Sequence, residues 1–141
     1  MNDPRPSNKS SAPPACAFCN ADASRIVWAG RLTLALWDAF PVSPGHALLV
    51  PRRHAPSWND LAVDEKAELV ESIDAVRLLI AEQYSPDAYN IGFNEGAAAG
   101  QTVMHFHVHV IPRYEGDMDD PRGGVRWVLP ERAAYWKVTE K

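Results

Sequence analysis

Three histidines at alternate positions are the residues best suited to chemistry in this 141-residue chain. His105, His107 and His109 lie in a largely apolar run, Val103 to Pro112, which predicts a strand. Strand side chains alternate between two faces, so the three imidazoles would share one face while the residues between them, Met104 included, pack on the core. The outer two would then be about 13 Å apart at Cα, too far for all three to bind one metal easily. At least one imidazole would therefore be free to act as a nucleophile or general base near pH 7.

A purely structural role is the alternative for these histidines, in which three partly buried imidazoles bind only the backbone.

A second candidate is the Cys16-x-x-Cys19 pair. Taken by itself, this pair is compatible with a metal site, a redox pair or chance. The redox interpretation requires a thioredoxin-like βαβ context, which the pattern lacks. A zinc site needs four ligands, usually from two separated pairs. Two cysteines are too few for a disulfide scaffold.

The elements that position these residues are predicted to be strands and one long helix. Apolar runs predict a hairpin over 25–37 and strands over 46–51, 88–94 and 103–112. Apolar residues at three- and four-residue spacing predict a helix over 64–84, with Asp64 as its N-cap. This order predicts an α+β fold, with an antiparallel sheet of about five strands and the helix packed on it.

Composition and charge exclude several classes of protein. The first 15 residues hold four of the 12 prolines and predict a flexible tail, followed by a single domain over 16–141 with a C-terminal extension. With 14 basic and 18 acidic residues, the net charge of -4 argues against a nucleic-acid binder. No apolar run approaches the roughly 18 residues of a membrane span, and the N-terminus lacks a signal-peptide core. We therefore expect a cytoplasmic protein with no membrane partner.

Three blocks in order, PGHALLVPRRH at 44–54, FNEGAAAGQTV at 93–103 and HFHVHVI at 105–111, resemble the histidine triad (HIT) superfamily. The resemblance extends over most of residues 16–113. It implies a HIT-like fold, a nucleotide substrate and a homodimer. The run GQTV, the triad and then IPR is most similar to bacterial dinucleoside polyphosphate hydrolases with a zinc-binding C-x-x-C. The phosphoramidase branch usually has glycine after the triad.

The resemblance also implies roles for the histidines. His107 would attack the α-phosphorus of the nucleotide, and water would resolve the nucleotidyl-histidine, releasing a nucleoside monophosphate. His109 would contact the phosphate, and His46 would support the site, with His105 completing the catalytic set. Either a phosphoric anhydride or a phosphoramidate bond could be cleaved. The same intermediate would serve a phosphorylase or nucleotidyltransferase, and a nucleotide sensor with residual catalysis is a further alternative.

The remaining implied roles concern nucleotide and metal. The family pattern implies that Asn94 and Gln101 contact phosphate oxygens, Asp38 binds ribose, and Phe18 and Trp37 line the base. Asn94 could instead be only a turn residue, and core packing is an equal alternative for Trp37. Arg113 would face either the polyphosphate or solvent. Arg122 and Arg126 would belong either to a phosphate-facing loop or to a surface turn or dimer contact. The metal ligands of zinc-containing relatives correspond to Cys16, Cys19, His54 and His105, which predicts a structural zinc. A divalent cation entering with the substrate is compatible with this pattern.

Overall fold

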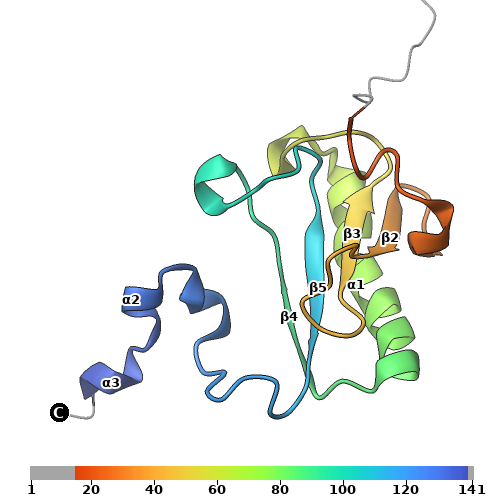
Figure 1. Cartoon of the computed structure of the whole chain (residues 1–141). Coiled ribbons are helices and arrows are strands. Elements are labelled where there is room, and N and C mark those ends of the chain that lie inside the picture. Colours follow the sequence, from red (N-terminus) through yellow and green to blue (C-terminus); the bar gives the residue numbers. More distant parts are fainter. Residues whose placement is uncertain (1–14, 140–141) are drawn as a thin grey trace, which may run out of the picture.

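The computed structural model describes residues 15–139, so all but the last residue of the predicted tail over 1–15 lies outside the described residues. A five-stranded antiparallel sheet and one long helix make up its core, which confirms the predicted α+β fold (Figure 1). The strands are β1 Ile26–Ala29, β2 Thr33–Trp37, β3 Ala47–Pro51, β4 Ala88–Gly92 and β5 Val108–Arg113. Their order across the sheet is β1-β2-β3-β5-β4, and every neighbouring pair is antiparallel. Strands β3 and β4 are shorter than predicted, because His46 precedes β3 and Asn94 follows β4.

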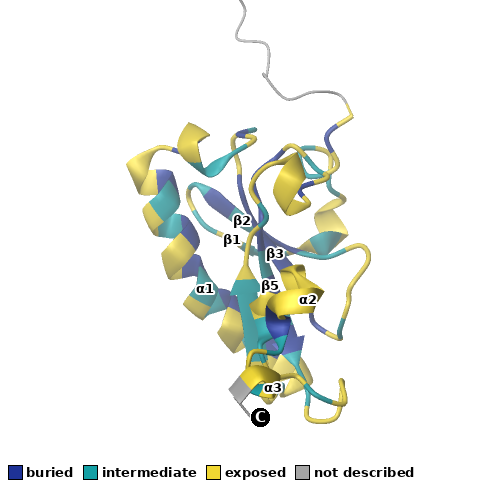
Figure 2. Cartoon of the chain, turned by 90° about the vertical axis from the view of Figure 1, so that its left-hand side faces the viewer, coloured by how far each residue is buried: buried dark blue, intermediate teal, exposed yellow. Residues whose placement is uncertain are grey.

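Helix α1, Val63–Tyr84, covers one face of the sheet, with a buried stripe toward the strands (Figure 2). The prediction that Asp64 is the N-cap is wrong, because the cap is Ala62 and Asp64 lies in the first turn. The carboxylate of Glu65 accepts the backbone N–H of Ala62 at 2.9 Å, which is the half of a capping box that the third residue of a helix supplies.

Both faces of the sheet are covered by apolar side chains. Toward α1 lies the larger cluster, which contains Ala35, Leu49, Leu69, Val76, Ile80, Phe106, Val108 and Val110. On the opposite face, Leu36, Leu48 and Val50 are buried with Phe18, Ala21 and Leu34 packed against them. Cross-strand partners share a face, and Leu48 pairs with His109. His109 therefore lies on the face away from α1.

The predicted strand over 103–112 is wrong in its first half, because β5 begins only at Val108. Its pairing with β3 ends at Leu49 and Val108, and Pro51 at the end of β3 has no N–H to continue the ladder. The carbonyl of Pro51 instead accepts a hydrogen bond from the His105 ring at 2.8 Å. Met104, expected in the core, is 47% exposed for the same reason.

Beyond Arg113 the chain leaves the sheet and forms a C-terminal segment (residues 114–139) of short turns and helices: η4 Gly124–Val128, α2 Pro130–Ala133 and α3 Trp136–Thr139. This segment projects to one side of the domain (Figure 1). The remaining short 3-10 turns are η1 Ala23–Arg25, η2 Trp58–Asp60 and η3 Ala97–Ala99. None of the helices between residues 15 and 139 has the length and apolar character required to cross a lipid bilayer.

Candidate active site and metal site

His107 is held in the tautomer that a nucleophile needs. Its Nδ1 lies 2.8 Å from the carbonyl oxygen of His105. A carbonyl can only accept, so Nδ1 carries the proton and the lone pair is on Nε2. The ring is buried between Phe18 and His109, whose ring centroids are 4.9 and 5.1 Å from its own. The structure therefore presents one lone pair in a site largely shielded from water.

A hydrogen-bonded chain, here called the histidine relay (Asp38, His46 and His109), lies beside His107. The backbone N–H of Val42 donates to Nδ1 of His46 at 3.2 Å, so the ring proton of neutral His46 is on Nε2. That Nε2 lies 2.9 Å from Nδ1 of His109 and 3.4 Å from a carboxylate oxygen of Asp38. Nδ1 of His109 is therefore the acceptor, and its Nε2 carries a proton. Such an N–H is suited to donate to a phosphate oxygen.

Burial keeps both relay histidines neutral. Desolvation, with smaller contributions from the neighbouring His107 and His46, lowers the pKa of His109 to about 4. Desolvation also lowers the pKa of His46, and the negative charge of Asp38 partly opposes this shift. At neutral pH the relay thus supplies oriented N–H donors without a net positive charge.

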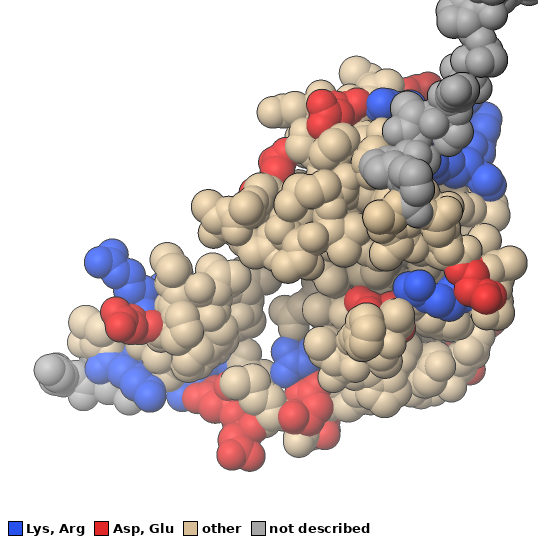
Figure 3. Space-filling view, turned by 45° about the horizontal axis from the view of Figure 1, so that its top comes forward, with Lys and Arg blue, Asp and Glu red and all other residues tan. Residues whose placement is uncertain are grey.

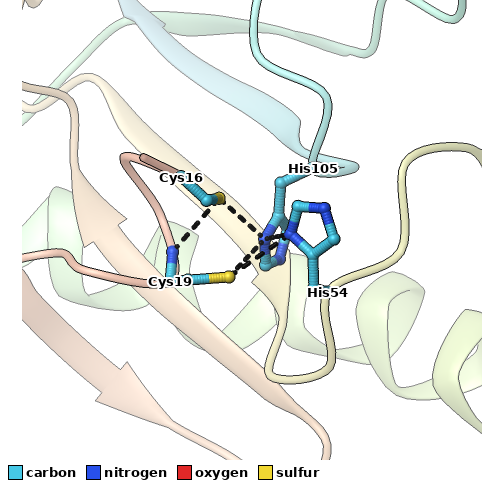
Figure 4. A group of neighbouring side chains, drawn as sticks. All are labelled: Cys16, Cys19, His54 and His105. Atoms are coloured by element: carbon cyan, nitrogen blue, oxygen red, sulfur yellow. Dashed lines mark hydrogen bonds between the residues drawn. The ribbon is translucent and has the colours of Figure 1, made fainter. Parts of the chain in front are cut away.

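A second cluster, here called the Cys2His2 cluster (Cys16, Cys19, His54 and His105), lies at the other end of the triad (Figure 4). Sγ of Cys16 is 3.5 Å and Sγ of Cys19 is 3.4 Å from Nδ1 of His105. Nδ1 of His54 is 3.3 Å from Sγ of Cys19 and 3.2 Å from Nδ1 of His105. Both cysteines are free thiols. These four atoms converge on one point and could hold a metal ion.

The outer nitrogen of His105 supports that interpretation. Nε2 donates to the carbonyl oxygen of Pro51, which leaves the Nδ1 lone pair directed at the two sulfurs. A metal-bound histidine commonly has its second nitrogen held in this way. The triad is thus divided between two sites, with His105 in the Cys2His2 cluster and the other two histidines at the candidate active site.

Comparison with known proteins identifies the family. The model of the HIT domain matches residues 21–116, which is most of the folded chain. The chain belongs to the HIT family.

Two curated relatives of this HIT protein carry enzyme names. It is 38% identical over 97 residues to an asymmetrical bis(5'-nucleosyl)-tetraphosphatase of Schizosaccharomyces pombe, a match that covers 69% of this chain and 53% of the relative. It is 35% identical over 97 residues to a bis(5'-adenosyl)-triphosphatase of Dictyostelium discoideum, covering 69% and 65%. The chain thus spans about half to two thirds of the length of these relatives.

A solved structure bears on the Cys2His2 cluster. The zinc-bound histidine triad family protein of Mycobacterium smegmatis matches with a TM-score of 0.66 and 28% identity, covering 90% of this HIT protein and 98% of that chain. That match covers more of this chain than the 69% covered by each of the two enzymes named above.

The two aromatic residues predicted at the base lie on opposite faces of the HIT sheet. Phe18 contacts the rings of His105 and His107 edge-on, at 5.8 and 4.9 Å between centroids. Trp37 instead packs with the helix-side cluster, where its ring lies 5.8 Å from that of Tyr84. Successive residues of β2 point to opposite faces, and Leu36, not Trp37, points toward Phe18. This packing favours the core alternative for Trp37 over a place at the base.

Gln101 is buried and fully occupied by backbone partners. Its Nε2 donates to the carbonyls of Pro56 and Val103 at 2.8 and 3.0 Å, and its Oε1 accepts from the N–H of Gly96 at 2.9 Å. Both amide hydrogens are thereby used, so a phosphate contact would require one bond to open. Asn94 is half-buried between β4 and η3.

The arginines beyond the triad are engaged with neighbouring protein groups. Arg113 makes a two-pronged ion pair with Asp117 at 2.8 Å and donates to Oδ1 of Asn90 at 2.7 Å. Arg122 pairs with Asp120 and lies over the ring of Trp136, and Arg126 donates to two carbonyls of the same C-terminal segment. The contacts of Arg122 and Arg126 favour the surface-turn alternative over a phosphate loop.

Sequence reasoning did not identify the individual groups that fix the ring tautomers. These are the N–H of Val42 and the carbonyls of His105 and Pro51, all of which are backbone atoms. Backbone groups carry no signal in residue type, so only the fold could reveal them.

Proposed function

We propose that this protein hydrolyses dinucleoside polyphosphates or related nucleotide conjugates through a covalent nucleotidyl-His107 intermediate. The observation that carries the proposal is the Nε2 lone pair of His107, fixed by the bond from its Nδ1 to the carbonyl of His105. The enzyme names of the two curated relatives support the substrate class.

In the first step, Nε2 of His107 attacks the α-phosphorus while the bond from that phosphorus to the bridging oxygen breaks. The electron pair leaves on the bridging oxygen, which becomes a terminal phosphate oxygen of the departing nucleotide. Nε2–H of His109 stabilises the developing charge on the α-phosphate by a hydrogen bond. The backbone-bonded Nδ1–H of His107 stays in place throughout.

In the second step, water attacks the same phosphorus and the phosphorus–nitrogen bond breaks, returning the electron pair to Nε2 of His107. The proton lost by water passes to solvent, and a nucleoside monophosphate is released. Two displacements on an activated phosphorus replace one difficult displacement.

The charge state of the relay favours an anhydride bond over a phosphoramidate. A departing phosphate has a second pKa near 6 and needs no proton at neutral pH. A departing amine does need one, whereas burial keeps His109 neutral with a pKa of about 4. The site therefore suits a phosphate leaving group.

For the nucleotide itself, we propose that the transferred base rests beside Phe18, which covers the buried cluster of Leu36, Leu48 and Val50. Asp38, which touches His46 and accepts the N–H of Phe40 at 2.8 Å, is proposed to bind the ribose with its remaining capacity. Asn94, Gln101 and Arg113 remain candidate phosphate ligands.

We further propose that the Cys2His2 cluster binds a structural zinc ion. A tetrahedral zinc with ordinary bond lengths places its ligand atoms about 3.3–3.8 Å apart. The four observed separations, 3.2–3.5 Å, lie close to the short end of that range. Four protein ligands leave no open position, so the ion would tie the Cys16–Cys19 turn to the triad segment rather than take part in the reaction.

The decisive experiment is a single-turnover reaction with diadenosine triphosphate, quenched in denaturant and analysed by mass spectrometry. We expect an adenylyl adduct on the peptide that contains residues 105–109, and no adduct in His107→Ala. Steady-state product analysis with and without inorganic phosphate then separates hydrolysis from phosphorolysis, since phosphorolysis would yield ADP from the adenylyl half. Tight nucleotide binding without adduct or turnover would favour the sensor alternative. The predicted homodimer is tested by light scattering.

A further inference from the structure

Three aromatic side chains, here called the aromatic stack (Trp58, Phe93 and Phe106), pack together beside the triad. The rings of Trp58 and Phe93 are nearly parallel, with centroids 5.6 Å apart and 11° between their planes. Phe106 lies edge-on to Phe93 at 4.8 Å and is tilted against Trp58 at 5.7 Å. These are geometries in which aromatic rings attract one another. Neither the proposed chemistry nor the metal site involves Trp58 or Phe93.

One end of the stack holds the segment that carries the nucleophile. Phe106 lies between His105 and His107 in the sequence, and its side chain is 1% exposed. This segment precedes β5 and has no ladder partner there, so its own contacts must fix it. The ring of Phe106 supplies one contact, and its backbone N–H donates to the carbonyl of Ala55 at 2.7 Å. Because the carbonyl of His105 sets the tautomer of His107, the placement of Phe106 helps to aim the Nε2 lone pair.

The other end of the stack holds the loop between β4 and the triad, here called the η3 loop (residues 93–103). It carries Asn94 and Gln101, the candidate phosphate ligands, and projects beyond the sheet (Figure 1). Residues 95–100 are all exposed, so the loop is held mainly by its two ends. At the first end, Phe93 directly precedes Asn94 and stacks on Trp58. The position of Asn94 therefore depends on the aromatic stack.

The turn that begins at Ala55 and ends in Trp58 is the common anchor of both segments. The backbone N–H of Trp58 donates to a carboxylate oxygen of Glu95 at 3.0 Å. The carbonyl of Pro56 accepts from Nε2 of Gln101 at 2.8 Å, which ties down the second end of the η3 loop. One short turn thus contacts both the loop with the candidate phosphate ligands and the segment with the nucleophile.

We propose that Trp58 is a positioning residue, which through the aromatic stack sets Asn94 at the correct distance from the nucleophile His107. This inference rests on the proposed hydrolase function and adds a residue to it. Trp58 acts through Phe93 and Phe106 rather than on the substrate. A displacement of about 1 Å between reacting groups can cost roughly 100-fold in rate, so nucleotidyl transfer should depend on this contact.

The stack is separate from the cavity beside Trp127. This cavity, of about 600 Å³, lies between the sheet and the C-terminal segment (Figure 3), and none of the three stacked rings lines it. Substitution of Trp58 therefore tests the η3 loop and the triad without altering the lining of that cavity.

The first part of the test needs no substrate and measures amide hydrogen exchange by mass spectrometry. In Trp58→Ala we expect the backbone amides of residues 94–101 to exchange about tenfold faster than in wild type, because the loop loses its anchor. Trp58→Phe, which retains a ring, should stay within about threefold of wild type. The matched control is Trp28→Ala on β1, at the opposite edge of the sheet from β4. Trp28 is also partly buried and packs on the same helix-side cluster, so its removal should lower Tm without changing exchange in the η3 loop.

The second part is a double-mutant cycle on the single-turnover rate of adenylyl transfer from diadenosine triphosphate. We expect Trp58→Ala and Asn94→Ala each to lower this rate about tenfold. Adding Trp58→Ala to Asn94→Ala should lower it only about threefold further or less, since the group that Trp58 positions is already gone. Trp28→Ala should lower the rate less than about twofold in either background, because distant sites behave independently. Trp58→Phe should recover most of the rate. Should Trp58→Ala not fold, Phe93→Leu takes its place in both parts, since Phe93 is 42% exposed and its loss costs less packing.

Four outcomes decide against the proposal, and they can be told apart. Absence of adduct and turnover in the wild-type protein overturns the hydrolase function and this inference with it. Turnover with fully additive losses in the cycle leaves the hydrolase intact and shows that Trp58 only supports the fold. Unchanged exchange of the η3 loop in Trp58→Ala shows that the stack does not hold the loop. Equal effects of Trp28→Ala and Trp58→Ala in either measurement assign the loss to general stability. Faster loop exchange together with a non-additive cycle, both absent in Trp28→Ala, supports the positioning role.

Discussion

The Cys2His2 cluster and the histidine relay each take one histidine from the same short stretch of chain, His105 and His109 respectively, yet they use imidazole in opposite ways. In the Cys2His2 cluster, the Nδ1 atoms of His54 and His105 face each other at 3.2 Å with two sulfurs beside them. In the relay, Nε2 of His46 donates to Nδ1 of His109 at 2.9 Å. In the Cys2His2 cluster, lone pairs point toward one another and can bind a metal ion. In the relay, the N–H of one ring donates to the lone pair of the next.

The difference arises from which nitrogen the backbone holds. His105 gives its Nε2 proton to the carbonyl of Pro51, so Nδ1 is left for a metal. His107 gives its Nδ1 proton to the carbonyl of His105, so Nε2 is left for phosphorus. Two residues of the same type, two positions apart, thereby acquire different chemistry without any charged neighbour being required.

The largest effect should come from removing the nucleophile. We expect His107→Ala to lower kcat for diadenosine triphosphate by at least roughly a thousandfold, because no other lone pair is directed at the phosphate. Metal content, measured by atomic emission, should stay at the wild-type level. His105→Ala is the matched variant and should lose both metal and activity.

Equal metal loss in the two variants would show that the triad forms one site rather than two. Retention of substantial turnover in His107→Ala would point to a direct attack by water and overturn the covalent route.

The next largest effect concerns stability and isolates the Cys2His2 cluster. We expect Cys19→Ser to release the metal and lower Tm by about 10 °C, since metal binding is coupled to folding. Ala17→Ser, at an exposed position in the same turn, is the control and should leave Tm within about 1 °C. Calorimetry of both proteins before and after chelation measures this.

An unchanged Tm after the metal has left would mean that the thiols and rings pack without it. Chelation should also lower the Tm of the wild-type protein toward that of Cys19→Ser. It should lower the Tm of His107→Ala by the same amount, so the difference in Tm between His107→Ala and wild type stays unchanged.

A smaller effect should follow from breaking the relay. In His46→Ala, Nδ1 of His109 loses its donor, and the ring can adopt the other tautomer or rotate. We expect kcat to fall by about 10- to 100-fold with KM little changed, a typical effect of removing a group that orients a reactive ligand. Steady-state kinetics at pH 7 checks this. His46→Gln, whose amide N–H can replace the donor, should recover part of the loss, and equal losses in both variants would argue against orientation.

Much of this arrangement could be predicted from residue types and spacing. Three-and-four periodicity located α1 to within one residue at its start, and the alternation of His105, His107 and His109 indicated divided roles. The grouping of Cys16 and Cys19 with two distant histidines followed from the family resemblance, and the structure brings the four together. These features depend on side-chain identity, which a sequence displays.

The features that escaped prediction depend on the backbone in three dimensions. The start of β5 at Val108 reflects where Pro51 ends the β3 ladder, and periodicity in one strand cannot show its partner. Trp37 carries the family's residue type but lies on the helix side, because the pleat of β2 assigns its face. The cavity beside Trp127 requires the C-terminal segment to fold back near β5, a long-range contact without a local signal.

The smallest predicted effect concerns protonation of the relay. Burial lowers the pKa of His109 to about 4, whereas the unfolded chain titrates near 6.5. Between these values the unfolded state binds more protons, so the free energy of unfolding falls as the pH drops from about 6.5 toward 4 and is insensitive to this group above 6.5. After allowance for solvent screening, we expect wild-type protein to lose about 1 kcal/mol between pH 7 and pH 5 through His109. Urea unfolding of wild type and His109→Gln with saturating metal at both pH values measures the difference. Equal losses in the two proteins would show that the relay is not the acid-sensitive part of the molecule and would shift attention to the metal ligands, whose protonation competes with binding.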